Sequence, residues 1–89
     1  MEGLGIMPSE YLAQLRDLIK PKLQEKGLKA LLVGSTLKIV KDGETVMNIS
    51  DKGEIVELTF KGKKYTYDKW YTKPEHLAAT IKTTLEHQL

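Results

Sequence analysis

The chain of 89 residues has no cysteine and only one arginine, Arg16. The absence of cysteine excludes a disulfide framework, a thiolate metal site and a cysteine nucleophile. The scarcity of arginine counts against base-specific recognition of nucleic acid, because the planar guanidinium is the group that reads guanine and clamps phosphate. The remaining basic residues are lysines, and the formal net charge of +2 is too small to imply a polyanionic partner by itself.

Long apolar runs are also missing from the sequence. No stretch approaches the roughly 20 residues needed to cross a bilayer, and residues 1–7 lack the basic and apolar segments of a signal peptide. Hydrophobic residues at 40% and charged residues at 29% are typical of a folded globular chain. We therefore expect a soluble, cytoplasmic protein without membrane contact, made of one domain over residues 8–89 after a flexible tail over residues 1–7.

Helical patterns stand at the two ends of the predicted domain. After Pro8, Ser9 is the expected N-cap of a first helix, and Gly27 its expected end. Pro21 lies inside this pattern and should kink or stop the helix, because proline lacks an N–H and clashes with the preceding turn. The apolar stripe of this helix consists of Leu12, Leu15, Ile19 and Leu23.

A second helix is expected after the segment Thr72-Lys73-Pro74-Glu75. Thr72 followed three residues later by Glu75 is typical of a capping box. Pro74 fits the first turn of a helix, where its missing N–H leaves no bond unmade. The apolar stripe of the second helix consists of Leu77, Ala78, Ile81 and Leu85.

Between the helices, short alternating runs are separated by turns that contain glycine. These turns are Gly34-Ser35, Asp42-Gly43, Asp51-Lys52-Gly53 and Lys61-Gly62. Short loops with glycine where φ must be positive predict β-hairpins. Four hairpins in series predict a five-stranded antiparallel meander with strands near 28–33, 36–41, 44–50, 54–60 and 64–70. The expected fold is α+β: helix, five-stranded antiparallel meander sheet, helix, with both helices packed on one sheet face.

The expected hairpin registers divide the strand residues between two faces. One face is nearly all apolar and should lie under the helices. Its predicted members are Leu28, Ala30, Leu32, Leu37, Ile39, Val46, Asn48, Val56, Leu58, Phe60, Tyr65 and Tyr67.

The opposite face has more apolar residues than a face that meets only water. Val40, Met47, Ile49 and Ile55 are predicted to lie on it, on adjacent strands. One interpretation is that the first helix, or the tail through Leu4, Ile6 and Met7, covers this face. The other is that a second chain docks there, most simply in a homodimer formed face to face or by edge pairing. The predicted partner-binding residues are Val40, Met47, Ile49, Ile55 and Trp70.

The segment 60–73 suggests an alternative function, because lysines alternate there with aromatic residues. Bases stack on aromatic faces while lysines follow phosphates, so this composition suits single-stranded nucleic acid or RNA. An ordinary solvated edge strand, protected by its lysines from aggregation, is the competing interpretation. The predicted nucleic-acid-binding residues are Lys61, Lys63, Lys64, Lys69, Trp70, Tyr71 and Lys73.

The chain offers few groups for catalysis or metal binding. His76 and His87 are the only histidines, and on one helix they lie about 16 Å apart along the axis, too far to share a metal ion. The serines fit a helix cap and turns rather than a nucleophile position. We therefore expect no catalytic residue, no metal and no cofactor. The sequence favours a non-catalytic interaction or oligomerisation module, with nucleic-acid binding as the alternative.

Overall fold

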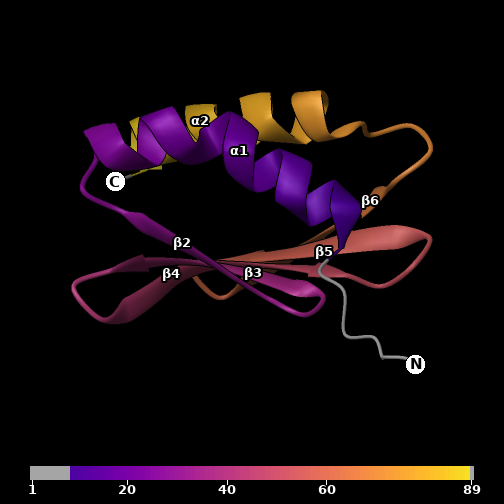
Figure 1. Ribbon diagram of the computed structural model, residues 1–89, viewed down its shortest axis with the longest axis horizontal. Helices are drawn as coiled ribbons and strands as arrows, with labels where there is room; N and C mark the ends of the chain where they lie inside the picture. The colour runs from indigo at the N-terminus through magenta and orange to yellow at the C-terminus, as the bar shows by residue number, and fades with distance from the viewer. Residues whose placement is uncertain (1–8, 89) are drawn as a thin grey trace.

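The computed structural model describes residues 9–88, which form a helix, five strands and a second helix (Figure 1). The elements are α1 (Glu10–Glu25), β2 (Lys29–Val33), β3 (Thr36–Lys41), β4 (Glu44–Asp51), β5 (Ile55–Phe60), β6 (Lys63–Asp68) and α2 (Pro74–Gln88). The strands form one antiparallel meander in the order β2-β3-β4-β5-β6. The predicted α+β fold is therefore confirmed. The predicted tail over residues 1–7 lies outside the described residues.

Helix α1 begins and ends where the sequence predicts. The Ser9 side chain accepts a hydrogen bond from the Leu12 N–H at 3.2 Å, as an N-cap does. At the other end, Gly27 has φ of +71° and follows the last turn. The helix continues through Pro21 to Glu25 without being divided. Pro21 is exposed, so the carbonyl group it leaves without an intrahelical partner can be solvated.

Helix α2 begins one residue later than the predicted capping box requires. The Lys73 carbonyl, and not the Thr72 side chain, makes the first bonds of the helix, accepting from the His76 and Leu77 N–H groups at 3.0 and 3.1 Å. Pro74 is the first helical residue and is buried. The preference of proline for the first turn thus determines the start of the helix more strongly than the threonine does.

Three of the four predicted hairpin turns form, although the pairing of strands beyond Asp42-Gly43 differs from the prediction. Asp42-Gly43 and Lys61-Gly62 have φ values of +51°/+82° and +51°/+79°. Positive φ at both central residues is the geometry of type I′ turns, whose twist matches that of paired strands. Leu32 pairs with Leu37 across the turn at Gly34-Ser35, and Leu58 pairs with Tyr65 across the turn at Lys61-Gly62, as two-residue loops at these positions require.

The register of β4 differs from the prediction because of a β-bulge. Val40 pairs with Thr45 but Ile39 pairs with Met47, so Val46 is an extra residue without a partner on β3. An extra residue reverses the side-chain alternation beyond it. Met47 and Ile49, predicted for the uncovered face, therefore lie in the core at 1% and 0% exposure.

The hairpin between β4 and β5 contains a second departure. The Lys52 N–H donates to the Ile55 carbonyl at 2.9 Å, which makes Gly53-Glu54 the loop and pairs Asp51 with Val56. The predicted three-residue loop, Asp51-Lys52-Gly53, would instead pair Val56 with Asn48, three residues before Asp51. Both departures shift the register by an odd number, so each reverses the faces and the two cancel. β5 and β6 consequently have the predicted orientation, and only β4 beyond the bulge is reversed.

The core lies between the sheet and the two helices, which both cover the same sheet face (Figure 1). The apolar stripes predicted for the helices are buried in it. From the strands and the loop before them it takes Leu28, Leu37, Ile39, Met47, Ile49, Val56, Leu58 and Phe60. We call the opposite sheet face, which no described helix covers, the outer face.

Candidate interaction surfaces

The outer face is less apolar than the sequence predicted. After the reversal of β4, Asn48 and Ser50 replace Met47 and Ile49 on it. Burial in the core prevents Met47 and Ile49 from touching a partner in this fold. The prediction of a continuous apolar surface across adjacent strands is therefore wrong.

Val40 and Ile55 do lie on the outer face, but near opposite ends of the sheet. Val40 pairs with Lys29 and Thr45, whereas Ile55 pairs with Asp68 and follows the turn at Gly53-Glu54. Val40 is half-buried and Ile55 is 37% exposed. They do not form one patch.

The largest exposed aliphatic side chains on the outer face belong to the edge strand β2. Leu31 is 50% exposed and Val33 is 68% exposed, and they are two residues apart on the same face. The next apolar residue on this face is Val40, whose pairing with Lys29 places it diagonal to Leu31. Leu31 and Val33 are not among the residues predicted from the sequence to bind a partner. Their signal was the unbroken apolar run 30–33 in a strand at the start of a meander.

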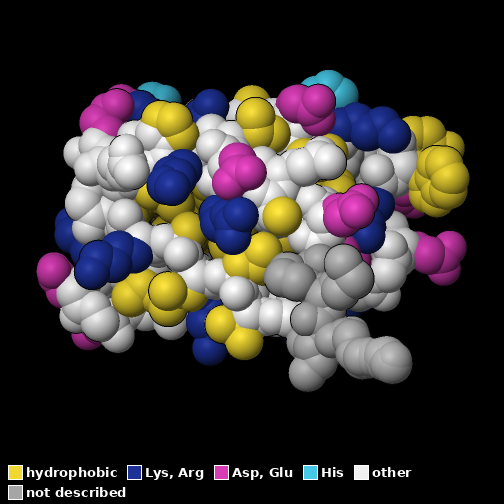
Figure 2. Space-filling view, in the orientation of Figure 1, with side chains coloured by type: hydrophobic (Ala, Val, Ile, Leu, Met, Phe, Trp, Pro, Cys, Tyr) yellow, Lys and Arg dark blue, Asp and Glu magenta, His cyan; other side chains and the backbone are white. Residues whose placement is uncertain are grey.

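A hollow runs between β2 and α1 on the helix side of the same edge. It has a volume of about 420 Å³ and is lined by Leu23, Leu28 and Ala30, by Lys29 of β2, and by Arg16, Asp17, Lys20 and Gln24 of α1. Figure 2, seen from the α1 side, shows hydrophobic side chains at the surface below this helix, interspersed with basic side chains. We refer to strand β2 with its exposed side chains and this hollow as the β2 edge.

The opposite edge strand, β6, is lysine-rich at one end. Lys61, Lys63 and Lys64 are exposed around the β5–β6 hairpin. Lys64 lies 3.9 Å from the Glu57 carboxylate, and Lys61 donates to the Gln88 carbonyl at 2.8 Å. Lysines on an edge oppose strand addition by another chain.

The exposed aromatic pair lies beyond the other end of β6, in the loop that leads to α2. Trp70 and Tyr71 are 75% and 84% exposed, and hydrophobic side chains project over this loop at the right of Figure 2. The last predicted strand ran to Trp70, but β6 ends at Asp68. Trp70 therefore lies in the loop and not in the strand. A strand of six residues spans about 20 Å. The lysines at the hairpin and this aromatic pair therefore do not form one patch.

Lys69, predicted to contact nucleic acid, makes an internal ion pair. Its ammonium donates to both oxygens of Asp51 at 2.8 and 2.9 Å and lies 5.5 Å from the centroid of the Tyr11 ring. Asp51 also accepts from the Ser9 hydroxyl and from the Gly53 N–H at 2.9 Å. We call Ser9, Tyr11, Asp51 and Lys69 the Asp51 cluster. It connects the start of α1 to the end of β4 and to the β6–α2 loop.

Two pKa shifts follow from this cluster. Partial burial raises the pKa of Asp51, but the hydrogen bonds from Lys69, Ser9 and Gly53 outweigh it and hold this pKa below the ordinary value. Burial, with the negative charge of Asp51, raises the pKa of Tyr11 to about 12. The Tyr11 hydroxyl donates to the Thr72 carbonyl at 2.6 Å. Each polar group thus has a structural partner, and the arrangement is that of a tether between elements.

Lys73 is exposed and lies beside the Asp51 cluster, next to Pro74 and Glu10. His76 and His87 are both exposed on α2. Within residues 9–88, no three histidine or acidic side chains come together in a group able to hold a metal ion. Neither helix of that part of the chain has the length and apolarity that a membrane crossing requires.

No family model matches this chain, and the comparisons with curated proteins and with solved structures find no match. The function must therefore be argued from the surfaces described above.

Proposed function

We propose that this protein is a non-catalytic homodimerisation module in which the β2 strands of two copies pair in antiparallel fashion. The single observation that carries the proposal is the exposure of Leu31 and Val33 on an edge strand. Among residues 9–88, β2 pairs with β3 on one side and with no strand on the other. An edge strand presents unpaired N–H and C=O groups that another strand can satisfy. A cytoplasmic location is part of this proposal.

Two-fold symmetry suggests a specific register for the pairing. An antiparallel pair centred on Leu31 places Leu31 opposite Leu31 of the partner subunit and Ala30 opposite Leu32 of the partner subunit. Leu31 would then gain an apolar cross-strand neighbour. Leu32 of the partner subunit would enter the hollow beside Ala30 on the helix side. The same fit is repeated on the other side of the two-fold axis.

The oligomeric state of matched variants tests this proposal. Gel filtration with light scattering should give twice the chain mass of 10.1 kDa for the full-length protein. Leu31→Lys should give the monomer mass, because charge on both strands at the axis opposes pairing. Ile55→Lys places the same charge on the outer face but away from the β2 edge, and this variant should remain dimeric.

Three results would contradict the proposal. The first is a monomeric full-length chain at high micromolar concentration. The second is a dimer that Ile55→Lys dissociates and Leu31→Lys does not, because that would assign the interface to the outer face. The third is a monomer that dimerises only after removal of residues 1–7, because that would assign the β2 edge to the N-terminal segment.

Single-stranded nucleic acid is a second candidate partner, favoured by the exposure of Trp70 and Tyr71. Bases stack on exposed rings of this kind. A labelled oligothymidylate should then quench the fluorescence of Trp70, the only tryptophan, and binding should weaken steeply with salt. Unchanged fluorescence at low salt would contradict this candidate function.

A further inference from the structure

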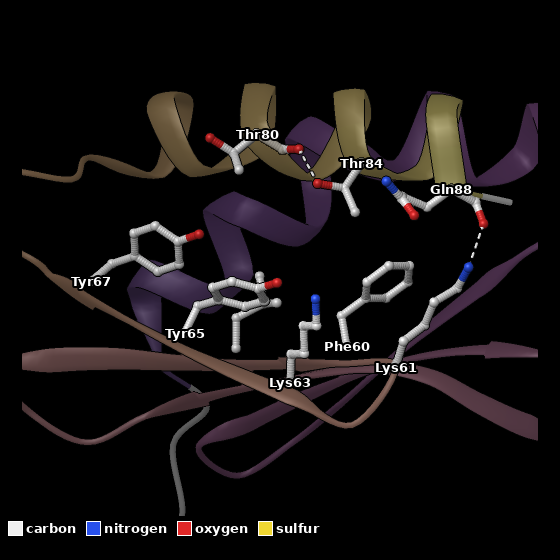
Figure 3. Close-up of a pocket in the computed structure, with 9 residues that line it drawn as sticks. Phe60, Lys61, Lys63, Tyr65, Tyr67, Thr80, Thr84 and Gln88 are labelled. Atoms are coloured by element: carbon white, nitrogen blue, oxygen red, sulfur yellow. Dashed lines mark hydrogen bonds between the residues drawn. The ribbon is translucent and has the colours of Figure 1, made fainter.

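Helix α2 stands further from the sheet than α1 does. Cα atoms of α1 come within 8 Å of strands β2, β3 and β4, whereas none of α2 comes this close to a strand. The space is occupied by side chains and by a cleft of about 330 Å³ between α2 and the β5–β6 hairpin (Figure 3). This volume lies at the small end of the range of ligand sites. We call it the β6–α2 cleft.

The walls of this cleft are apolar and aromatic. Leu58 and Phe60 are buried residues of its lining. The rings of Tyr65 and Tyr67 extend from β6 toward α2 (Figure 3). On the helix side, the hydroxyl of Thr84 donates to the Thr80 carbonyl at 2.8 Å.

The hydroxyl of Thr80 likewise donates to the His76 carbonyl, at 3.2 Å. Because both threonine hydroxyls bond back to the helix, their methyl groups face the cleft (Figure 3). An aromatic ring could therefore lie between the tyrosines and these methyl groups without burying an unpaired helix donor.

The few polar groups at the cleft are suited to an anion. Lys61 and Lys63 line it and no carboxylate does. Lys61 is engaged with the Gln88 carbonyl. Lys63 makes no hydrogen bond or ion pair with any residue in 9–88, and in Figure 3 its ammonium points toward α2.

The tyrosine hydroxyls add hydrogen-bond donors to this positive charge. Neither Tyr65 nor Tyr67 bonds its hydroxyl to another residue of the described chain, and both hydroxyls are directed into the cleft (Figure 3). Burial, and then the neighbouring Tyr65, raises the pKa of Tyr67. A tyrosine phenol is protonated at neutral pH even at its ordinary pKa, so the Tyr67 hydroxyl can donate a hydrogen bond.

We propose that the β6–α2 cleft binds a small aromatic carboxylate. The ring lies between Tyr65 and the methyl groups of Thr80 and Thr84, and the carboxylate accepts hydrogen bonds from Lys63 and Tyr67. The cleft lies along β6, on the opposite edge of the sheet from β2. Dimerisation through the β2 edge leaves it open, so this binding neither requires nor prevents the proposed dimer.

Titration with 2-naphthoate, followed by backbone amide NMR shifts of the full-length protein, tests this proposal. Saturable shifts are expected at Phe60, Tyr65 and Thr84, and the neutral 2-naphthalenemethanol should bind more weakly. Lys63→Gln should weaken binding of 2-naphthoate about three- to fivefold, the upper part of the range for an exposed charge pair. Lys64→Gln is the matched control, because Lys64 pairs with Thr59 and lies on the outer face. It should leave the affinity unchanged.

A second pair of variants fills the cleft without changing its charge. Thr84→Phe should abolish the shifts, whereas Thr83→Phe, at an exposed position outside the cleft, should preserve them. The proposal is overturned by the absence of saturable shifts at millimolar 2-naphthoate, by shifts confined to the hollow beside β2, by equal losses in Lys63→Gln and Lys64→Gln, or by unchanged binding in a folded Thr84→Phe variant.

Discussion

The two edge strands of the sheet differ in what they present to a neighbour. β2 places Leu31 and Val33 on the outer face, half or more exposed. β6 places Lys64, Thr66 and Asp68 on that same face. Both edges have unpaired backbone groups, so the difference lies in the side chains: charge on β6 opposes strand addition, whereas the apolar surface of β2 favours it. The contrast indicates that one edge is suited to association and the other is protected from it.

The helix side also differs between the two edges. α1 lies close to β2, and the hollow beside this strand is lined by Leu23, Leu28 and Ala30 and by the charged residues Arg16, Asp17, Lys20 and Lys29. α2 stands further from β6, and the aromatic cleft between them has two lysines among its lining residues. The β2 side thus combines apolar residues with charges of both signs, whereas the β6 side has aromatic rings and positive charge only. The two proposals accordingly assign another β-strand to the β2 edge and a small anion to the β6 side.

The largest expected effect tests the register on which this comparison depends. Ile49→Asp should unfold the protein, because it buries a carboxylate in the core at a cost of about 4 kcal/mol or more. Asn48→Asp, one residue earlier and on the outer face beside Lys38, should change the free energy of unfolding by less than about 1 kcal/mol. Chemical denaturation followed by circular dichroism measures both. A folded Ile49→Asp variant together with an unfolded Asn48→Asp variant would mean that Asn48, and not Ile49, faces the core. That result would contradict the bulge in β4.

The next effect removes the contrast between the edges. Lys64→Leu combined with Thr66→Val gives β6 an outer surface like that of β2. The double variant should form assemblies larger than a dimer, because each protomer then has two edges able to accept a strand. Sedimentation velocity measures the distribution. A double variant with the same mass as the wild type would show that side-chain charge is not what distinguishes the edges.

The smallest effect concerns the Asp51 cluster, which connects α1 to the sheet. Asp51→Asn should lower the free energy of unfolding by about 1.5–3 kcal/mol at neutral pH, the range for hydrogen bonds to a charged group. The folded-state pKa of Asp51 lies below its unfolded value. Its contribution is therefore present above the unfolded pKa, near 4, and is lost as the pH falls through the folded pKa.

Thermal unfolding of wild type and Asp51→Asn between pH 7 and pH 2 checks this prediction. The gap between their midpoints should narrow as the pH falls. Glu54→Gln removes an exposed carboxylate outside the cluster and controls for general loss of negative charge. A gap that is constant over the whole range, or that widens in acid, would contradict the assigned role of the carboxylate.

Much of the fold could be predicted because its local signals agree. Ser9, Gly27 and the glycine-containing hairpins each require a backbone geometry that few alternatives satisfy. The turn residues give no such signal for the bulge at Val46. The predicted register of β4 was therefore wrong. One warning was present: the predicted register put Asn48 on the buried face, where an amide without a partner costs about 1–3 kcal/mol. The observed register exchanges it for Met47 and Ile49.

The candidate surfaces were less predictable than the fold. The Lys69–Asp51 pair joins residues 18 positions apart in the sequence. The distance between α2 and β6 depends on how the two helices pack against each other and the sheet. Neither has a signature in local spacing. The prediction grouped the lysines of 60–73 with Trp70 and Tyr71 from composition alone. Composition contains no information on the length of β6, which separates them.

The most direct test of the β2 pairing uses a single introduced thiol, since the natural chain has no cysteine. Leu31→Cys places the sulfur at the proposed two-fold axis, where antiparallel Cα atoms lie about 4.5–5.5 Å apart and can be joined by a disulfide. Mild oxidation should convert Leu31→Cys into a disulfide-linked dimer, while Ile55→Cys stays predominantly monomeric on a non-reducing gel. Equal crosslinking of the two variants, or crosslinking of Ile55→Cys alone, would contradict strand pairing at the β2 edge.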